Sequence, residues 1–262
     1  MPRPVGEKRR KLVPCCPSDR WVLSSFIRWP VAWRTFSRFP IGRCARRRRP
    51  RPRASRLPAQ AQHYLGSVGR FIVLEGGEAA GKSTQAALLA EHLGAVLTRE
   101  PGGTAIGEAL RRLLLEQSLV APVPRAETLL LLAARAQHVA EVIEPALARG
   151  DDVVCDRYSG STLAYQGYGR GLDLDELREL DSWANGHRVP DLVVLLDLPV
   201  EIARERLGRS HPDRFESEGD DFLMSVQAGF RRLAAQDPLR WRVVDASGTV
   251  DEVAALVRKA VD

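Results

Sequence analysis

Cysteine and lysine are both scarce in this chain of 262 residues. Three of the four cysteines fall before residue 45, and the spacing of the four matches no zinc site or disulfide framework. The remaining one, Cys155, stands in "DVVCD" and is typical of a buried strand in a reducing compartment. The chain has four lysines and 35 arginines, so arginine is its usual basic residue and the lysine at position 82 is an exception.

Long apolar runs are also missing, because charges and prolines interrupt them, and we expect no membrane-spanning segment. Charge is unevenly distributed along the chain. Residues 1–60 hold 17 Lys and Arg against two acids, whereas residues 61–262 hold 22 against 31. The overall charge of +6 therefore combines a basic arm with an acidic body, and it does not make the whole chain a nucleic-acid-binding protein.

The basic arm, residues 1–67, is predicted to be a disordered extension, since it is rich in Arg and Pro and has little regular pattern. A targeting peptide and an arm that binds RNA or DNA are alternatives. Another alternative is a start site assigned too far upstream, with translation beginning near Val68. Nucleic-acid binding is not expected of the body.

From Val68 onward, short apolar runs alternate with segments of helical spacing. Strands are predicted at 70–75, 95–100, 152–156, 191–199 and 240–246. Helices are predicted at 82–94, 105–117, 125–150 (one helix or two), 174–186, 200–209, 220–236 and 250–261. This order indicates an α/β fold, a parallel sheet between two layers of helices formed by residues 68–262. Ligands bind such sheets at the carboxyl ends of the strands.

The stretch "GGEAAGKST", residues 76–84, fits the phosphate-binding loop (P-loop) pattern and lies between a predicted buried strand and a predicted helix. Glycines let backbone N–H groups surround phosphate oxygens, and the helix N-terminus adds positive potential. A lysine ammonium fits between β- and γ-phosphates better than the planar arginine fork, which explains Lys82. Ser83 is a candidate Mg²⁺ ligand. The predicted ATP-binding residues are Gly76, Gly77, Glu78, Ala79, Ala80, Gly81, Lys82, Ser83 and Thr84.

Three further stretches narrow the function: "TREPGGTAIGEALR" (98–111), "DRYSGSTLAYQGYGRGL" (156–172) and "HPDRFE" (211–216). Together with the phosphate loop they resemble bacterial thymidylate kinase over about residues 69–262. The resemblance implies a P-loop NTPase fold with a mobile lid, and phosphorylation of dTMP to dTDP by MgATP in dTTP synthesis. It also implies a cytoplasmic homodimer that packs through the long apolar helix at 127–145 and its neighbours.

An acceptor that is already a phosphate needs cations rather than a strong general base. The resemblance implies that Arg157 grips the phosphate of dTMP and that Arg135 reads the edge of thymine. It places Arg99 in the acceptor pocket. For each of these arginines, the alternative is an ordinary surface charge.

Two carboxylates belong to the same predicted site. Asp156 follows a buried strand, where a carboxylate would hold Mg²⁺ directly or through water, although an Asp capping a helix would look the same. Glu78 resembles the loop acid that contacts the sugar 3′-OH or the metal shell, and a tolerated loop residue is the alternative. The resemblance places Ser161, Thr162, Tyr165 and Gln166 against the base and deoxyribose. Tyr165 would exclude a ribose 2′-OH, although a tyrosine in a helix is otherwise usually core.

The Arg-rich segment 204–219 resembles the mobile lid, which would bring Arg209 and Arg214 to the phosphates as internal arginine fingers. Arg206 is a weaker candidate, and a solvated basic turn is the alternative. The phosphate loop itself contains no arginine, which is typical of the subtype whose transition-state cations come from the lid.

The sequence departs from the family pattern at three positions. Leu131 replaces an aromatic that stacks on thymine, Ala79 replaces a common loop glycine, and Ala134 replaces a frequent Asp. A deoxynucleoside kinase is the nearest rival, but its hydroxyl acceptor needs a base, for which Glu78 and Glu100 are the candidates. Guanylate and adenylate kinases lack support from these motifs. A nucleic-acid-binding ATPase and a non-catalytic nucleotide-binding paralogue are the remaining alternatives.

Overall fold

A computed structural model describes residues 69–116, 121–208, 214–215 and 217–262 of the chain. All of these residues belong to one unit of the chain, Leu57–Asp262. The predicted arm (1–67), the predicted finger Arg209 and the rest of 209–213 lie outside the described residues.

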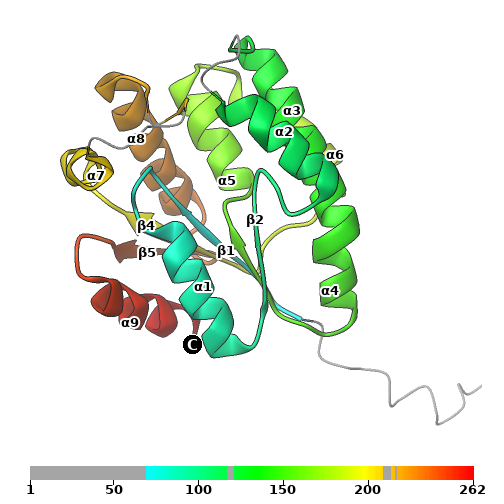
Figure 1. Ribbon diagram of the computed structural model, residues 1–262, viewed down its shortest axis with the longest axis vertical. Coiled ribbons are helices and arrows are strands. Elements are labelled where there is room, and N and C mark those ends of the chain that lie inside the picture. Colours follow the sequence, from blue (N-terminus) through cyan, green and yellow to red (C-terminus); the bar gives the residue numbers. More distant parts are fainter. Residues whose placement is uncertain (1–68, 117–120, 209–213, 216) are drawn as a thin grey trace, which may run out of the picture. The chain divides into compact units, whose positions relative to one another are not determined.

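Within the described residues, five parallel strands form one sheet, as the alternation of apolar runs and helices predicts, and the structure gives their order as β2-β3-β1-β4-β5 (Figure 1). The central strands are buried along almost their whole length, whereas β2 and β5 at the edges are partly exposed. The strands are β1 (Phe71–Gly76), β2 (Val96–Arg99), β3 (Val153–Asp156), β4 (Leu192–Asp197) and β5 (Trp241–Asp245).

Helices cover both faces of the sheet, which confirms the predicted fold class (Figure 1). None of the helices within the described ranges is long and apolar enough to span a bilayer. The α-helices are α1 (Lys82–Leu93), α2 (Ala105–Leu115), α3 (Pro124–His138), α4 (Glu144–Ala148), α5 (Ser159–Thr162), α6 (Leu174–Ala184), α7 (Val200–Leu207), α8 (Asp220–Gln236) and α9 (Val250–Val261).

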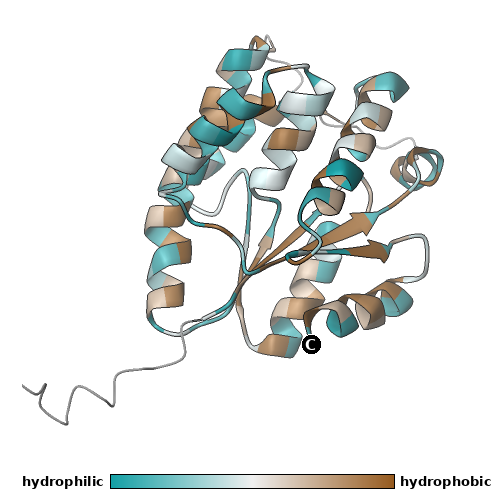
Figure 2. Cartoon of the chain, turned by 180° about the vertical axis from the view of Figure 1, so that it is seen from behind, coloured by the Kyte–Doolittle hydropathy of each residue, from teal (hydrophilic) through white to brown (hydrophobic). Residues whose placement is uncertain are grey.

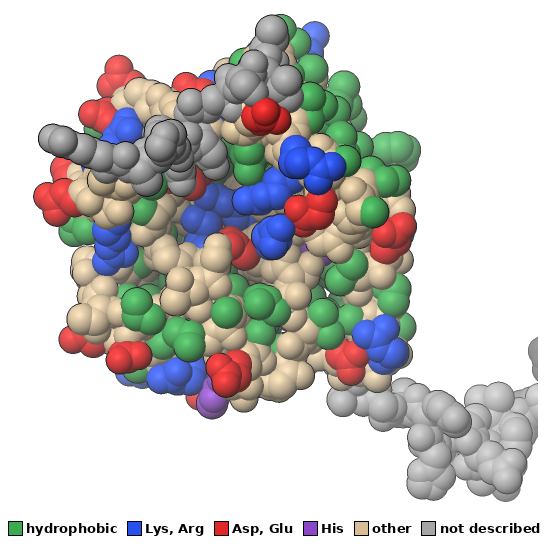
Figure 3. Space-filling view, viewed as in Figure 1, with side chains coloured by type: hydrophobic (Ala, Val, Ile, Leu, Met, Phe, Trp, Pro, Cys, Tyr) green, Lys and Arg blue, Asp and Glu red, His purple; other side chains and the backbone are tan. Residues whose placement is uncertain are grey.

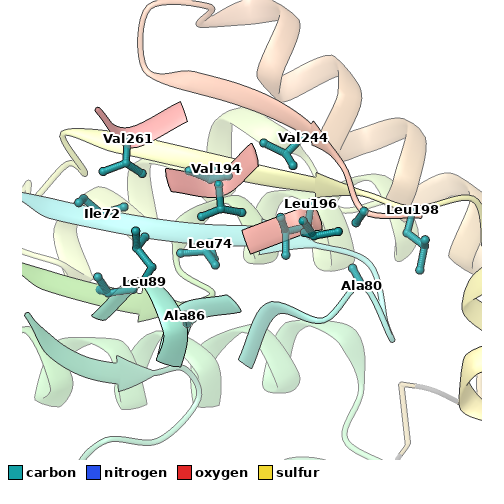
Figure 4. Packing of buried hydrophobic residues seen from close by; sticks show 14 of the residues in the cluster. Ile72, Leu74, Ala80, Ala86, Leu89, Val194, Leu196, Leu198, Val244 and Val261 are labelled. Carbon is teal, nitrogen blue, oxygen red and sulfur yellow. The ribbon is translucent and has the colours of Figure 1, made fainter. Parts of the chain in front are cut away.

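Side chains alternate between the two faces along each central strand, because the side-chain period of a strand is two. In β1, Ile72 and Leu74 join the cluster that α1 and α9 complete with Leu89 and Val257 (Figure 4). Phe71 and the other odd-numbered residues of β1 face the opposite layer. The central strands are accordingly mostly hydrophobic, with their charged residues near the carboxyl ends, whereas the helices mix hydrophobic and hydrophilic residues (Figure 2).

The long apolar helix predicted at 125–150 forms as three consecutive segments, with the wider η2 (Val139–Ile143) between α3 and α4. Pro145 supplies the physical reason, because it has no N–H to donate to the carbonyl four residues earlier and so weakens the α-helical ladder. A second wide segment, η3 (Leu163–Gly169), continues from α5 and carries the "YQG" residues. Parallel register aligns the ends of β1, β2 and β3 at one edge, where Arg99 pairs with Asp156.

Candidate active site

The phosphate loop leaves β1 at Gly76 and enters α1 at Lys82. Gly76 has φ +149°, and a Cβ there would lie 2.6 Å from the carbonyl oxygen of Leu196 on β4. Gly81 caps α1 with φ +84°. Ala79 has φ +53°, so this position does require the left-handed conformation that glycine adopts more readily.

Lys82 is buried and turns back over its own loop, where Nζ donates to the carbonyl oxygen of Gly77 at 2.6 Å. Burial is the main cause that lowers the pKa of Lys82 to about 8, and repulsion from Arg157 adds to it. The nearby carboxylates of Glu78 and Asp156 oppose this shift. The ammonium therefore lies against the backbone of the phosphate loop, and its pKa is well below that of an exposed lysine.

Ser83 and Asp156 meet beside the loop, with Ser83 Oγ donating to Asp156 Oδ2 at 2.5 Å. The second oxygen, Asp156 Oδ1, is buried and accepts no hydrogen bond within the described part of the chain. Within the described ranges, no three His, Cys, Asp or Glu side chains are grouped so that they could hold a metal ion. One carboxylate and one hydroxyl fit a Mg²⁺ that takes its other ligands from phosphates and water, whereas they do not make an all-protein metal cage.

Arg157 follows β3 with φ +71°, and its guanidinium joins the loop to η3. Nη1 donates to the carbonyl of Gly76 at 3.0 Å, and Nη2 pairs with Glu78 Oε1 at 2.8 Å. The guanidinium also lies 5.1 Å from the ring centre of Tyr165, whose hydroxyl donates to Glu78. Burial opposes ionisation of Glu78, but the charges of Arg157 and Lys82 more than offset it, so the pKa of Glu78 is lowered.

Arg135 on α3 is almost fully buried between two carboxylates. Nε donates to Glu100 Oε2 at 2.7 Å, and Nη1 contacts Asp181 on α6 and donates to Thr162 Oγ1 at 3.0 Å. Burial alone would lower the pKa of Arg135, and the two carboxylates reverse that effect and raise it. His138 continues the network, with Nδ1 2.9 Å from Glu100 Oε1.

These residues surround one cavity of about 350 Å³ at the carboxyl edge of the sheet. Figure 3 shows Lys and Arg side chains gathered in a hollow of this face, with acidic side chains beside them. The predicted site residues that line the cavity are Glu78, Ala79, Gly81, Lys82, Ser83, Thr84, Arg99, Leu131, Arg135, Asp156, Arg157, Ser161, Thr162, Tyr165 and Gln166.

Arg99 lines the cavity from a half-exposed position and pairs with Glu108 at 2.9 Å. Sequence reasoning gave no role to four other lining residues, Pro101, Arg111, Leu115 and Phe215. All of them except Leu115 stand inside the motifs quoted above. Arg111 is held beside Pro101, whose carbonyl it contacts at 3.0 Å through Nη1.

Arg206 and Arg214 of the predicted lid lie in different places, and the closure that would bring Arg214 to the phosphates stays a prediction. Arg214 pairs with Glu127 Oε2 at 2.6 Å and does not line the cavity. Arg206 instead reaches the loop backbone, where Nη1 lies 3.4 Å from the carbonyl of Ala79, and it also contacts the carbonyl of Ala246 at 2.9 Å. The carboxylate of Glu127, which comes from a distant element, holds Arg214 in its present position, and the sequence pattern gives no sign of this pair.

A further residue that sequence reasoning missed is Glu75, the polar end of the apolar run "FIVLE". Its fully buried carboxylate accepts from the backbone N–H groups of Tyr158 and Ser161, each at 3.0 Å, and from Ser161 Oγ at 2.6 Å. Glu75 therefore ties the start of α5 to the sheet beneath Arg157. Burial, partly offset by these hydrogen bonds and by Arg157, raises the pKa of Glu75 to about 7.

A parallel sheet with a phosphate loop after β1 and a cationic cavity at its carboxyl edge defines a P-loop nucleotide-binding enzyme. The family model "Thymidylate kinase" matches residues 74–257. The chain belongs to the thymidylate kinase family, whose reaction converts dTMP to dTDP, and the predicted function is confirmed.

Individual relatives agree with the family match. A thymidylate kinase of Cupriavidus metallidurans is 47% identical over 198 residues, covering 74% of this chain and 98% of the relative. One from Synechococcus sp. strain JA-3-3Ab is 52% identical over 198 residues, covering 73% and 94%. The crystal structure of thymidylate kinase from Ehrlichia chaffeensis has a TM-score of 0.61 at 31% identity and covers 74% of this chain and 99% of that one.

Proposed function

We propose that the cavity binds dTMP beside the terminal phosphate of ATP and transfers that phosphoryl group directly between them. The observation that carries this proposal is the placement of Lys82, Arg157 and Glu78 around one cavity. A dTMP phosphate oxygen is already a nucleophile, so the site has to align two anions rather than remove a proton. A deoxynucleoside kinase would instead need a free carboxylate base, and Glu78 is paired with Arg157.

The donor end binds ATP through the backbone of residues 76–84 and the ammonium of Lys82. Ser83 and Asp156 would hold Mg²⁺, which neutralises charge on the β- and γ-phosphate oxygens when it is bound. The unpartnered Asp156 Oδ1 beside the Ser83 hydroxyl supports this assignment. Lys82 follows the transferred group and stabilises its charge in the transition state.

The acceptor end is assigned by the position of each side chain in the cavity. Arg157 grips the phosphate of dTMP, and Glu78, kept ionised by Arg157 and Lys82, accepts from the sugar 3′-OH. Burial raises the pKa of Tyr165 well above its ordinary value, so its phenol stays protonated and its ring blocks a 2′-OH.

The base is read at the opposite end of the cavity from the loop residues. Arg135 there faces thymine with Thr162 and Gln166, while Ser161 lies beside Arg157. Arg99, half exposed, adds positive charge to the acceptor pocket.

A coupled ADP-release assay tests the proposal, with dTMP, dUMP, UMP, GMP and thymidine as acceptors and Lys82→Ala as the blank. We expect strong preference for dTMP over UMP and thymidine, and dependence on added Mg²⁺. Preference for thymidine would support the deoxynucleoside kinase instead. ATP binding without transfer to any acceptor would support the non-catalytic paralogue.

We also propose a homodimer that packs through α3 and α6, two helices in mutual contact. Their outward faces carry Leu129, Leu180 and Trp183, the last 79% exposed, and exposed apolar clusters of this kind mark interfaces. Light scattering should give twice the chain mass, and Trp183→Glu should lower it while the control Leu239→Glu, at an exposed leucine elsewhere, should not. A monomeric wild-type chain would refute the dimer.

The division into a basic extension (1–67) and a catalytic domain (68–262) stays a prediction, and the family match beginning at residue 74 supports it. Activity of residues 68–262 alone would test it. A cytoplasmic location likewise stays a prediction, supported by the family membership.

A further inference from the structure

The carboxylate of Glu127 on α3 contacts three side chains from two other segments of the chain, η3 with its cap and the predicted lid. Its side chain is 1% exposed. Gln166 Nε2 of η3 donates to Oε1 at 2.8 Å, and Arg214 Nη1 donates to Oε2 at 2.6 Å. Arg170, with Nη2 at 3.4 Å from Oε2, is a more distant third partner. A buried carboxylate needs such partners, and removing one leaves charge uncompensated.

Two of the three nitrogens of the Arg214 guanidinium have hydrogen-bond partners, and Nη2 is buried without one within the described part of the chain. Besides the pair with Glu127, Nε donates to the backbone carbonyl of Leu114, the penultimate residue of α2, at 2.7 Å. Its guanidinium also lies 4.5 Å from the ring centre of Phe215, the next residue. These contacts fix the backbone at 214 and hence the direction in which the side chain of Phe215 leaves it.

Phe215, unlike Arg214, lines the cavity. It is 8% exposed, and its ring meets the ring of Tyr165 edge-on, with centroids 5.6 Å apart. Leu115 and Leu131 line the same cavity. Within the described ranges, Tyr165 and Phe215 are the aromatic side chains in the lining, and Leu131 provides apolar contact without a ring.

We propose that Phe215 is the aromatic contact for the base of the acceptor, and that Arg214 is a positioning residue which sets Phe215 through Glu127. The inference rests on the proposed dTMP pocket. An aromatic ring attracts a heteroaromatic base through edge or stacked contact, which partly replaces the ring that position 131 lacks. Gln166 and Arg214 both donate to Glu127. The same carboxylate therefore positions the polar Gln166 directly and the apolar Phe215 through Arg214.

The proposed positioning role of Arg214 and the role of an arginine finger predict changes in different kinetic constants. A finger acts on charge that develops in the transition state, so its loss lowers kcat by roughly 10²–10³-fold. Loss of a ground-state base contact raises KM for dTMP by roughly 3- to 10-fold and leaves kcat nearly unchanged. KM for ATP should not change, because ATP binds at the other end of the cavity.

Steady-state kinetics of the full chain test the proposal, with Arg214→Ala, Arg214→Lys and Phe215→Leu. The proposal expects a raised KM for dTMP in Arg214→Ala and Phe215→Leu, and no further increase in the double variant, because both act through one contact. Arg214→Lys should recover part of the loss by keeping a cation on Glu127. Arg240→Ala, which removes an exposed arginine paired with Asp237, is the matched control.

A rescue experiment distinguishes the loss of an aromatic contact from general damage to the pocket. Adding Leu131→Phe to Phe215→Leu should lower KM for dTMP again, because it returns a ring to the cavity from α3. A fall in kcat of about 100-fold in Arg214→Ala with unchanged KM would overturn the proposal and restore the finger. Failure of Leu131→Phe to recover any affinity would overturn the role of the ring. A wild-type chain without activity on dTMP would overturn the proposed function itself, which the wild-type assay reports separately.

Discussion

The two ends of the cavity are built in different ways. The proposed donor end is mainly one segment, residues 76–84, to which β3 adds Asp156. The shape of this segment follows from local backbone conformation at Gly76, Ala79 and Gly81. The acceptor end is assembled from α3, α6, the loops after β2 and β3, and the lid. Its ion pairs join Glu78 to Arg157 and Glu100 to Arg135 across long stretches of chain. The donor end thus depends mainly on a local sequence motif, whereas the acceptor end depends on contacts between distant parts of the chain.

The cations at the two ends of the cavity also differ, in their pKa shifts and in their ion-pair partners. Burial lowers the pKa of Lys82 to about 8, whereas the carboxylates around Arg135 and Arg157 raise the pKa of each arginine. Within the described residues, Lys82 donates to a backbone carbonyl and forms no salt bridge, so its ammonium would remain available for a phosphate. The acceptor arginines are instead already ordered by ion pairs before substrate binds, which lowers the cost of placing them.

The largest expected effect is on activity at the donor end. Lys82→Ala should lower kcat by about 10²–10³-fold, because it removes the cation on the transferred group. Lys82→Arg should recover little of this, since a planar fork fits the slot poorly. The coupled ADP-release assay measures both. The free energy of unfolding should hardly change, and a wild-type rate for Lys82→Arg would show that any cation suffices.

At the acceptor end the large effect should be on stability. Arg135→Ala leaves the buried carboxylates of Glu100 and Asp181 without their shared cation, which costs about 3–5 kcal/mol of unfolding free energy. Urea denaturation followed by circular dichroism measures this, and Arg99→Ala at a half-exposed ion pair is the control. If Arg135→Ala were as stable as Arg99→Ala, the acceptor end would not depend on its ion pairs.

Glu75 lies between the two ends of the cavity, and its titration should make the stability of the fold depend on pH. Its pKa rises from 4.5 to about 7 on folding, so the folded state holds its proton more tightly than the unfolded state. The stabilisation from this group is complete below about pH 4.5 and is lost as the pH rises through about 7. Glu75→Gln keeps an acceptor for the two N–H groups and cannot ionise. Relative to wild type, it should gain stability between pH 5 and pH 8, as thermal denaturation across that range would detect; a constant difference would contradict the shifted pKa.

The smallest expected effect concerns the conformation of the loop. Ala79 adopts φ +53°, which glycine adopts at lower cost, so Ala79→Gly should raise the unfolding free energy by up to about 1 kcal/mol. Calorimetry would measure a slightly higher Tm. A lower Tm would mean that the Ala79 methyl group, which packs on the core cluster, contributes more than the backbone conformation costs.

The difference between local motifs and contacts across distant elements also explains which features could be predicted from the sequence. The parallel strands and the phosphate loop followed from alternating periodicity and from glycine spacing, whereas the order of the strands in the sheet did not. The meeting of Ser83 with Asp156 followed from their places at the ends of a helix and a strand. Phe215 and the Glu127–Arg214 pair did not follow, because their partners lie 87 positions apart or come from different elements. The split of the long helix follows from Pro145, a local signal that the apolar pattern outweighed.

By itself the sequence determined the α/β class, the nucleotide loop and the thymidylate kinase family, because these depend on short-range periodicity and on residues adjacent in the chain. Only the tertiary structure decided which arginines face the cavity. Each guanidinium has the same local preference, and the nearest buried carboxylate, brought from a distant element, selects its direction: Glu78 for Arg157, Glu100 and Asp181 for Arg135, and Glu127 for Arg214.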